Sequence, residues 1–185
     1  MGVAEPDLLA IAKVFELITN NLKVGIAMDQ AEQRLDTRLQ LYRLEKRPTS
    51  TLGDCMFDAI SDQLLLHKGI TTSAKAVRGA IVQWLRNNAG VHFGGAPLHA
   101  LLDPGEEWDT YCTTMSNPIT WGDLICLVAA THLYNTQIVL WSSFPGDQFV
   151  SYLSEEEKPH SFLLGYLDDW HYISLGRIGG IVITT

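Results

Sequence analysis

A cysteine at the start of a helical pattern is the residue in this chain whose setting best supports chemistry. Cys55 follows a Gly53-Asp54 turn, and apolar residues recur at helical spacing after it, which predicts a helix over 55–67. Unpaired N–H groups at a helix N-terminus favour a thiolate over a thiol, and with the turn they can bind an oxyanion. We expect Cys55 to be a nucleophile.

A candidate base for Cys55 lies far downstream, in Trp170-His171-Tyr172. The pattern predicts a strand that begins after a tight turn at 167–169, and a strand would hold His171 rigidly. An imidazole there could take the thiol proton, and the imidazolium could then protonate a leaving amine. The two residues together predict a cysteine hydrolase. From composition alone, a buried structural role for Cys55 remains open.

The composition limits the classes of partner and cofactor. The chain has 185 residues and a formal net charge of −8, which fits one domain and disfavours nucleic acid or an anionic membrane as partner. We expect a monomer. Its three cysteines form no CxxC pair, and its histidines share no metal-ligand spacing, so we expect no metal site. Sparse cysteines and the absence of a signal-peptide pattern predict a reducing, intracellular compartment.

The elements that must position Cys55 and His171 divide into early helices and late strands. We expect helices over 7–20, 27–45, 55–67, 73–88, 106–115 and 121–134, and strands over 137–141, 148–153, 162–166, 170–175 and 181–184. This order predicts an α+β fold with a small central sheet flanked by helices. Residues 1–47 are interpreted as an N-terminal helical extension, and 48–185 as the catalytic domain. The extension either packs as a cap or presents a surface that grips a protein.

Three blocks of this sequence resemble the ovarian tumour (OTU) superfamily of deubiquitinating cysteine proteases, which have a papain-like fold. Residues 53–60, Gly-Asp-Cys-Met-Phe-Asp-Ala-Ile, are similar to its nucleophile motif. Residues 121–123, Trp-Gly-Asp, resemble the start of its Trp-Gly-Gly helix. Residues 162–166 and 171–175 resemble its closing hairpin, which carries the base. The blocks occur in family order and together cover about 51–176.

The resemblance implies an activity and a partner. It implies that Cys55 is the nucleophile and His171 the general base and acid, with ubiquitin or a ubiquitin-like modifier as substrate and no cofactor. The bond cleaved would be an isopeptide or peptide bond after the C-terminal glycine. Gly53 and Trp170 are candidate substrate contacts. Trp170 either lines a channel for the glycine-glycine tail or covers the core.

The chain departs from the family where an acid would orient the histidine. The family often has Asp or Asn two residues after the histidine, or an acid three residues before the cysteine, and these positions hold Ile173 and Leu52. Neither side chain accepts a hydrogen bond. Three explanations remain open: another acid orients His171, a Cys–His dyad suffices, or the domain mainly binds ubiquitin. The candidate acids are Asp54, Asp168, Asp169, Asp29 and Asp36.

Overall fold

Four of the five strands of the large sheet lie late in the chain, after all the described helices. The computed structural model of the protein describes residues 8–49, 53–167 and 171–179. Its helices are α1 (Leu8–Leu41), α2 (Cys55–Lys68), α3 (Ala74–Asn87), the short 3₁₀ helix η1 (Leu98–Leu101), α4 (Trp108–Met115) and α5 (Leu124–Leu133). Its strands are β1 (Leu44–Lys46), β2 (His92–Phe93), β3 (Ala96–Pro97), β4 (Gln137–Ser142), β5 (Val150–Tyr152), β6 (Ser161–Leu167) and β7 (His171–Arg177).

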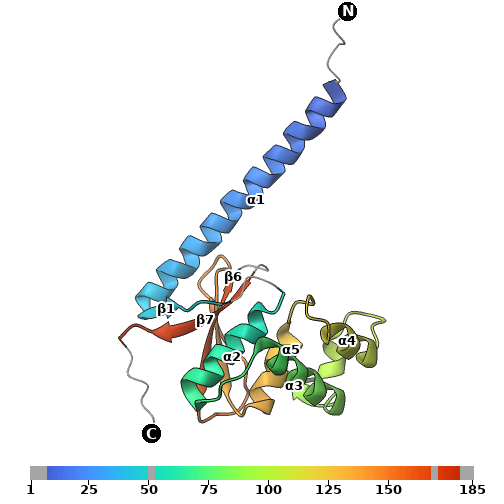
Figure 1. Cartoon of the computed structure of the whole chain (residues 1–185), viewed down its shortest axis with the longest axis vertical. Helices are drawn as coiled ribbons and strands as arrows, with labels where there is room; N and C mark the ends of the chain where they lie inside the picture. Colours follow the sequence, from blue (N-terminus) through green and yellow to red (C-terminus); the bar gives the residue numbers. More distant parts are fainter. Residues whose placement is uncertain (1–7, 50–52, 168–170, 180–185) are drawn as a thin grey trace, which may run out of the picture.

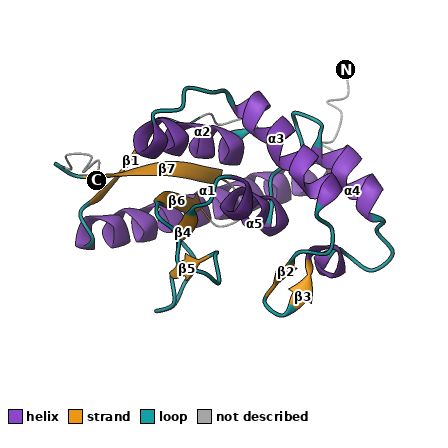
Figure 2. Ribbon diagram, turned by 90° about the horizontal axis from the view of Figure 1, so that it is seen from below, coloured by secondary structure: helices purple, strands orange, loops and turns teal. Residues whose placement is uncertain are grey.

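One five-stranded sheet organises the structure. Its strand order is β1-β7-β6-β4-β5, and β2 and β3 form a separate hairpin. Strands β4 and β6 are parallel, and the other neighbouring pairs in the large sheet are antiparallel. Figure 2 shows α2 on one side of this sheet and α1 on the other. The expected α+β fold, a small sheet flanked by helices, is confirmed.

The alternation of residues along β7 separates two apolar cores, one on each face of the sheet. Tyr172 belongs to the larger core, which contains Cys55 and the apolar residues of α2, α3 and α5. Ile173 and Leu175 belong to a smaller core with Leu35 and Leu39 of α1. Successive side chains of a strand point to opposite faces, so the helix that carries Cys55 and the helix that precedes it in sequence cover different faces.

The N-terminal segment differs from its prediction. A break was expected at Asn20-Asn21 and Gly25, but α1 is one continuous helix from Leu8 to Leu41. Glycine inside a helix costs only about 1 kcal/mol relative to alanine, which a long helix tolerates. The first part of α1 extends away from the sheet, and its last turns pack on the sheet through Ala31, Leu35 and Leu39 (Figure 1).

The segment before residue 48 also contributes a strand. Strand β1 pairs with β7, with Lys46 opposite Leu175 and Leu44 opposite Arg177. The boundary between residues 47 and 48 stays a prediction, but residues on its N-terminal side complete the sheet and one of its cores. The expected strand over 181–184 lies outside the described residues.

Candidate active site

The nucleophile candidate lies at the first residue of α2, as expected. Asp54 occupies the N-cap position, and its carbonyl accepts the first helical bond from the Asp58 N–H at 2.8 Å. The backbone N–H of Tyr172 donates to Cys55 Sγ at 3.5 Å. Because Tyr172 follows His171 directly, the fold brings the two predicted catalytic residues to the same place from distant parts of the sequence.

The environment of Cys55 raises the pKa of its thiol, contrary to the expectation of a stabilised thiolate. Burial of the side chain, which is 2% exposed, is the main cause, and the carboxylate of Asp54 adds to it. The N–H groups of Tyr172, Met56 and Cys55 itself lower the pKa but do not outweigh the burial. A helix start favours a thiolate, but at this buried position the cost of desolvating the charged sulfur is larger.

The environment of His171 shifts the histidine pKa in the complementary direction. Burial lowers the pKa of the half-buried imidazole, and the positive charge of Lys46 lowers it further. At neutral pH this favours a neutral imidazole, which can accept a proton. Both pKa directions favour the neutral forms, a thiol at Cys55 and an imidazole at His171, so a thiolate would form by proton transfer to a base.

The described residues offer no orienting acid for the His171 ring, since no hydrogen bond joins the ring to any of them. Ile173 is buried among the apolar side chains of α1 and the sheet. Asp36 binds Lys46 at 2.7 Å, and Asp29 is exposed on α1. Two other candidates, Asp168 and Asp169, lie outside the described residues, as do Leu52 and the predicted substrate contact Trp170.

Asp54 is held by an arginine that the sequence reasoning did not single out. Arg78 on α3 is buried, with 3% of its side chain exposed, and its Nε donates to Asp54 Oδ1 at 2.8 Å. Its Nη2 donates to the carbonyl of Gly53 at 3.1 Å. This favours a role for Asp54 in shaping the turn over a role in orienting His171. The sequence pattern that could have identified Arg78 as buried is its helical spacing with Ile81 and Leu85, which places it on the apolar face of α3.

Gly53 and Gly122 allow two loops to approach the start of α2. A Cβ on Gly53 would lie 2.9 Å from the carbonyl oxygen of Ile119, and one on Gly122 would lie 2.1 Å from Met56 Cε. Any side chain at either position would collide with the neighbouring segment. The glycine of the predicted Trp-Gly-Asp block thus brings Trp121 next to the nucleophile helix.

A groove of about 420 Å³ lies beside the start of α2. Trp121, Leu124, Leu140, Tyr166 and Tyr172 are among its lining residues. The rings of Tyr166 and Tyr172 pack against each other at a tilt of 33° with centroids 4.7 Å apart, and about half of Trp121 is exposed. Tyr172, which lines this largely apolar groove, also donates its backbone N–H to Cys55 Sγ, so the groove includes a residue bonded to the nucleophile candidate.

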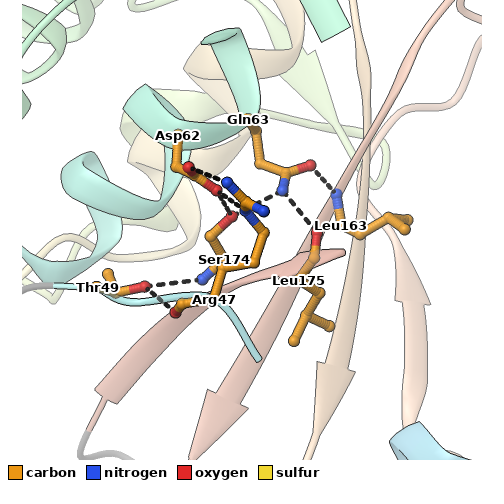
Figure 3. Close-up of polar contacts among 7 residues, drawn as sticks. All are labelled: Arg47, Thr49, Asp62, Gln63, Leu163, Ser174 and Leu175. Carbon is orange, nitrogen blue, oxygen red and sulfur yellow. Dashed lines mark hydrogen bonds and ion pairs between the residues drawn. The ribbon is translucent and has the colours of Figure 1, made fainter. Parts of the chain in front are cut away.

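A polar network, which the sequence reasoning also missed, fixes α2 against β7 (Figure 3). Gln63 donates to Ser174 Oγ and to the carbonyl of Leu175, each at 2.8 Å, and Ser174 Oγ donates to Asp62 at 2.5 Å. Arg47 binds the Asp62 carboxylate through two nitrogens at 2.6 and 3.0 Å. The network joins the helix that begins at Cys55 to the strand that begins at His171.

The Asp62 carboxylate stays charged within this network. Burial raises its pKa, but the hydrogen bonds from Arg47 and Ser174 and the charge of Arg47 bring the pKa below the usual value. A buried polar network is stabilising only when its members are satisfied, and here every member has a partner. The spacing between Cys55 and β7 is thus set by directional bonds as well as by apolar packing.

Other classes of site find no support in the part of the chain that the structure describes. Among these residues, no group of three or more His, Cys, Asp or Glu side chains is arranged to hold a metal ion. None of the described helices is both long enough and apolar enough to cross a membrane. The candidate catalytic side chains among the described residues are those of Cys55 and His171.

A cysteine at a helix start, a histidine at the start of a neighbouring strand and an α+β fold are the arrangement expected of a papain-like cysteine protease. Residues 50–174, more than half of the chain, match the family described as OTU-like cysteine protease. The chain therefore belongs to the OTU family of cysteine proteases.

Individual relatives agree with this assignment. The chain is 30% identical over 144 residues to OTU domain-containing deubiquitinating enzyme 12 of Arabidopsis thaliana, covering 77% of this chain and 61% of that protein. It is 27% identical over 152 residues to enzyme 9 of the same plant, covering 82% and 41%. The chain thus spans less than two thirds of the length of these curated relatives.

Solved structures show the same fold. The OTU domain of OTUD1 superposes with a TM-score of 0.65 at 18% identity, covering 82% of this chain and 97% of that domain. An OTU domain in complex with ubiquitin gives a TM-score of 0.53 at 18% identity, covering 71% of this chain and 69% of that one. At such identities the likeness is one of fold.

Proposed function

We propose that this chain is a deubiquitinase that hydrolyses isopeptide or peptide bonds after the C-terminal glycine of ubiquitin, with Cys55 as nucleophile and His171 as general base. The observation that carries the proposal is the hydrogen bond from the Tyr172 N–H to Cys55 Sγ, which places the thiol beside the strand that begins at His171. The proposal is supported by the names of the plant relatives and by the likeness to an OTU domain in complex with ubiquitin.

The reaction follows from the protonation states of the two side chains. The neutral imidazole of His171 takes the thiol proton as Cys55 Sγ attacks the carbonyl carbon, and the oxyanion forms next to the N–H groups of the turn and of the α2 start. The intermediate collapses when the imidazolium gives its proton to the leaving amine. Water, deprotonated by His171, then attacks the thioester and releases Cys55.

The groove is a suitable path for the substrate tail. It is largely apolar, is lined by the rings of Tyr166 and Tyr172, and includes in Tyr172 a residue bonded to Cys55 Sγ. A chain that ends in two glycines can lie in such a groove because it has no side chains near the bond to be cleaved. The tail of a ubiquitin-like modifier would fit equally well, so the modifier must be established by experiment.

Reaction with ubiquitin that carries a C-terminal electrophile tests the proposal. We expect the wild type to gain the mass of one ubiquitin and Cys55→Ala to gain none. A parallel reaction with a ubiquitin-like modifier carrying the same electrophile identifies the substrate. A folded wild type that forms no adduct with either modifier would refute the proposed activity.

The second candidate function is a ubiquitin-binding module with little activity. The buried Ile173, at the position where relatives often orient the histidine, and the raised pKa of Cys55 favour it. Binding of ubiquitin by a wild type that forms no adduct would support this function.

The compartment and the oligomeric state remain proposals. Cys55, Cys112 and Cys126 are all free and buried, which supports a reducing, intracellular compartment. We propose that the chain acts as a monomer. Size-exclusion chromatography with light scattering would test this at working concentration.

A further inference from the structure

Arg78 is the most extensively bonded side chain next to the nucleophile. Besides Asp54 and Gly53, its guanidinium donates to the carbonyls of Met115 at 2.9 Å, Pro118 at 3.2 Å and Thr120 at 2.8 Å. Its central carbon lies 3.9 Å from the centroid of the Phe57 ring. A planar guanidinium has five N–H donors in a fixed geometry. Here these donors connect α3, which carries Arg78, to the 53–54 turn and to residues 115–120.

These contacts join the turn before Cys55 to the loop that precedes α5. Arg78 binds Gly53 and Asp54 on one side and the carbonyls of residues 115–120 on the other. The two segments also touch directly, since the Cα of Gly53 lies against the backbone of Ile119. The conformation of the turn therefore depends on a buried arginine from a third element, α3.

Fixing the Gly53 carbonyl also fixes an N–H group. The carbonyl of Gly53 and the N–H of Asp54 belong to the same planar trans peptide, so they point in opposite directions. While Arg78 Nη2 holds the carbonyl, the Asp54 N–H must point away from the guanidinium. Donors to an oxyanion are effective only when they are oriented before charge develops.

Arg78 also balances the charge closest to the thiol. The Asp54 carboxylate raises the pKa of Cys55 and thus opposes formation of the thiolate. The buried guanidinium contacts the same, partly exposed carboxylate, with Nη2 2.7 Å from Asp54 Oδ1. One buried side chain thus orients the turn and offsets its negative charge.

We propose that Arg78 is a positioning residue for acyl transfer, which holds the 53–54 turn in the conformation that stabilises the oxyanion. It acts through the backbone of the turn and does not itself touch the substrate. This inference rests on the proposed hydrolysis by Cys55, and it assigns a role to a residue on α3, outside the nucleophile and histidine segments.

The test compares a reaction that forms an oxyanion with one that does not. Hydrolysis of a fluorogenic amide of ubiquitin passes through a tetrahedral oxyanion, whereas alkylation of Cys55 by iodoacetamide does not. In Arg78→Met we expect kcat to fall about 10²-fold with KM within about twofold of wild type. The rate of alkylation at matched pH should change far less than kcat.

Two further variants separate positioning from folding. Arg78→Lys keeps a positive charge but cannot bridge the two segments, so its kcat should stay well below wild type. This variant also serves as the test if Arg78→Met does not fold. Arg86→Met removes an exposed arginine from the same helix and should leave kcat, KM and alkylation unchanged.

The outcomes distinguish this inference from the proposed function. An inactive wild type would refute the hydrolysis itself. Two results would overturn the positioning role while leaving the proposed function intact. The first is wild-type kcat in folded Arg78→Met or Arg78→Lys. The second is an equal loss of hydrolysis and of alkylation.

Discussion

The two sides of the site are stabilised in different ways. Cys55 and the turn before it are held by a buried arginine, two close glycine contacts and a backbone N–H. His171 lies at the start of a strand, half-buried, with no hydrogen bond from its ring to any described residue. Direct hydrogen bonds therefore fix Cys55 and its turn, whereas His171 is fixed only through the strand to which it belongs.

This difference shows how the backbone can place a histidine whose ring bonds to no acid among the described residues. Three residues after His171, Ser174 is bonded to Gln63 and Asp62 of α2, the same helix that begins at Cys55 (Figure 3). The strand is therefore anchored to the nucleophile helix, and rotation of β7 relative to α2 is restricted. We infer that strand anchoring partly replaces the side-chain contact that Ile173 cannot make. The variants below test this comparison.

The largest effect is expected from His171→Ala. Removing a general base typically costs 10²–10⁴-fold, and we expect kcat for ubiquitin hydrolysis to fall about 10³-fold. His160→Ala, at an exposed histidine, is the control and should retain wild-type kcat. Wild-type activity in His171→Ala would mean that another group deprotonates Cys55.

Ile173→Asn introduces a side chain that can accept a hydrogen bond, two residues after His171. Because Ile173 packs against Leu35 and Leu39 of α1, we expect the carboxamide to be buried without partners and the free energy of unfolding to fall by about 3 kcal/mol. Urea unfolding measures this loss, and Ile173→Val should lose only about 1 kcal/mol. An increase in kcat in Ile173→Asn would show that strand anchoring alone leaves His171 poorly oriented.

Ser174→Ala tests the anchoring directly. Loss of the hydroxyl removes one partner each from Gln63 and Asp62, and we expect the free energy of unfolding to fall by about 2 kcal/mol. Because Ser174 helps to keep the pKa of Asp62 low, part of the loss should disappear as pH falls and Asp62 becomes protonated in both proteins. Ser151→Ala, on the exposed face of β5, is the stability control. If β7 positions His171, kcat should fall in Ser174→Ala while KM is retained.

The smallest effect is expected from Lys46→Met, which removes the positive charge near the base and the ion pair with Asp36. Burial and the Lys46 charge lower the pKa of His171, so removing the charge should raise this pKa towards its ordinary value. His171 must be neutral to act as a base, so the acidic limb of kcat/KM should move to higher pH. Lys75→Met, at an exposed lysine on α3, should leave the pH profile in place. A shift to lower pH would contradict the assignment of this limb to His171.

Much of the site was predictable because it depends on local patterns. The helix after Cys55 and the strand that carries His171 follow from apolar periodicity and turn residues, and the three motif blocks follow from the resemblance to the OTU superfamily. These features lie within short stretches of the chain, where neighbouring residues determine the backbone conformation. The amino-acid sequence by itself therefore determined the family, the fold class and the two catalytic candidates.

The tertiary structure decided what surrounds these candidates. Arg78 at the turn, Lys46 near His171 and the bond between Gln63 and Ser174 join residues that are far apart in the sequence. The direction of the Cys55 pKa shift likewise depends on burial by distant elements rather than on the helix start alone. Apolar periodicity predicts which face of a helix or strand is buried. It does not predict which residues pack against that face, because those contacts depend on the packing of the whole chain.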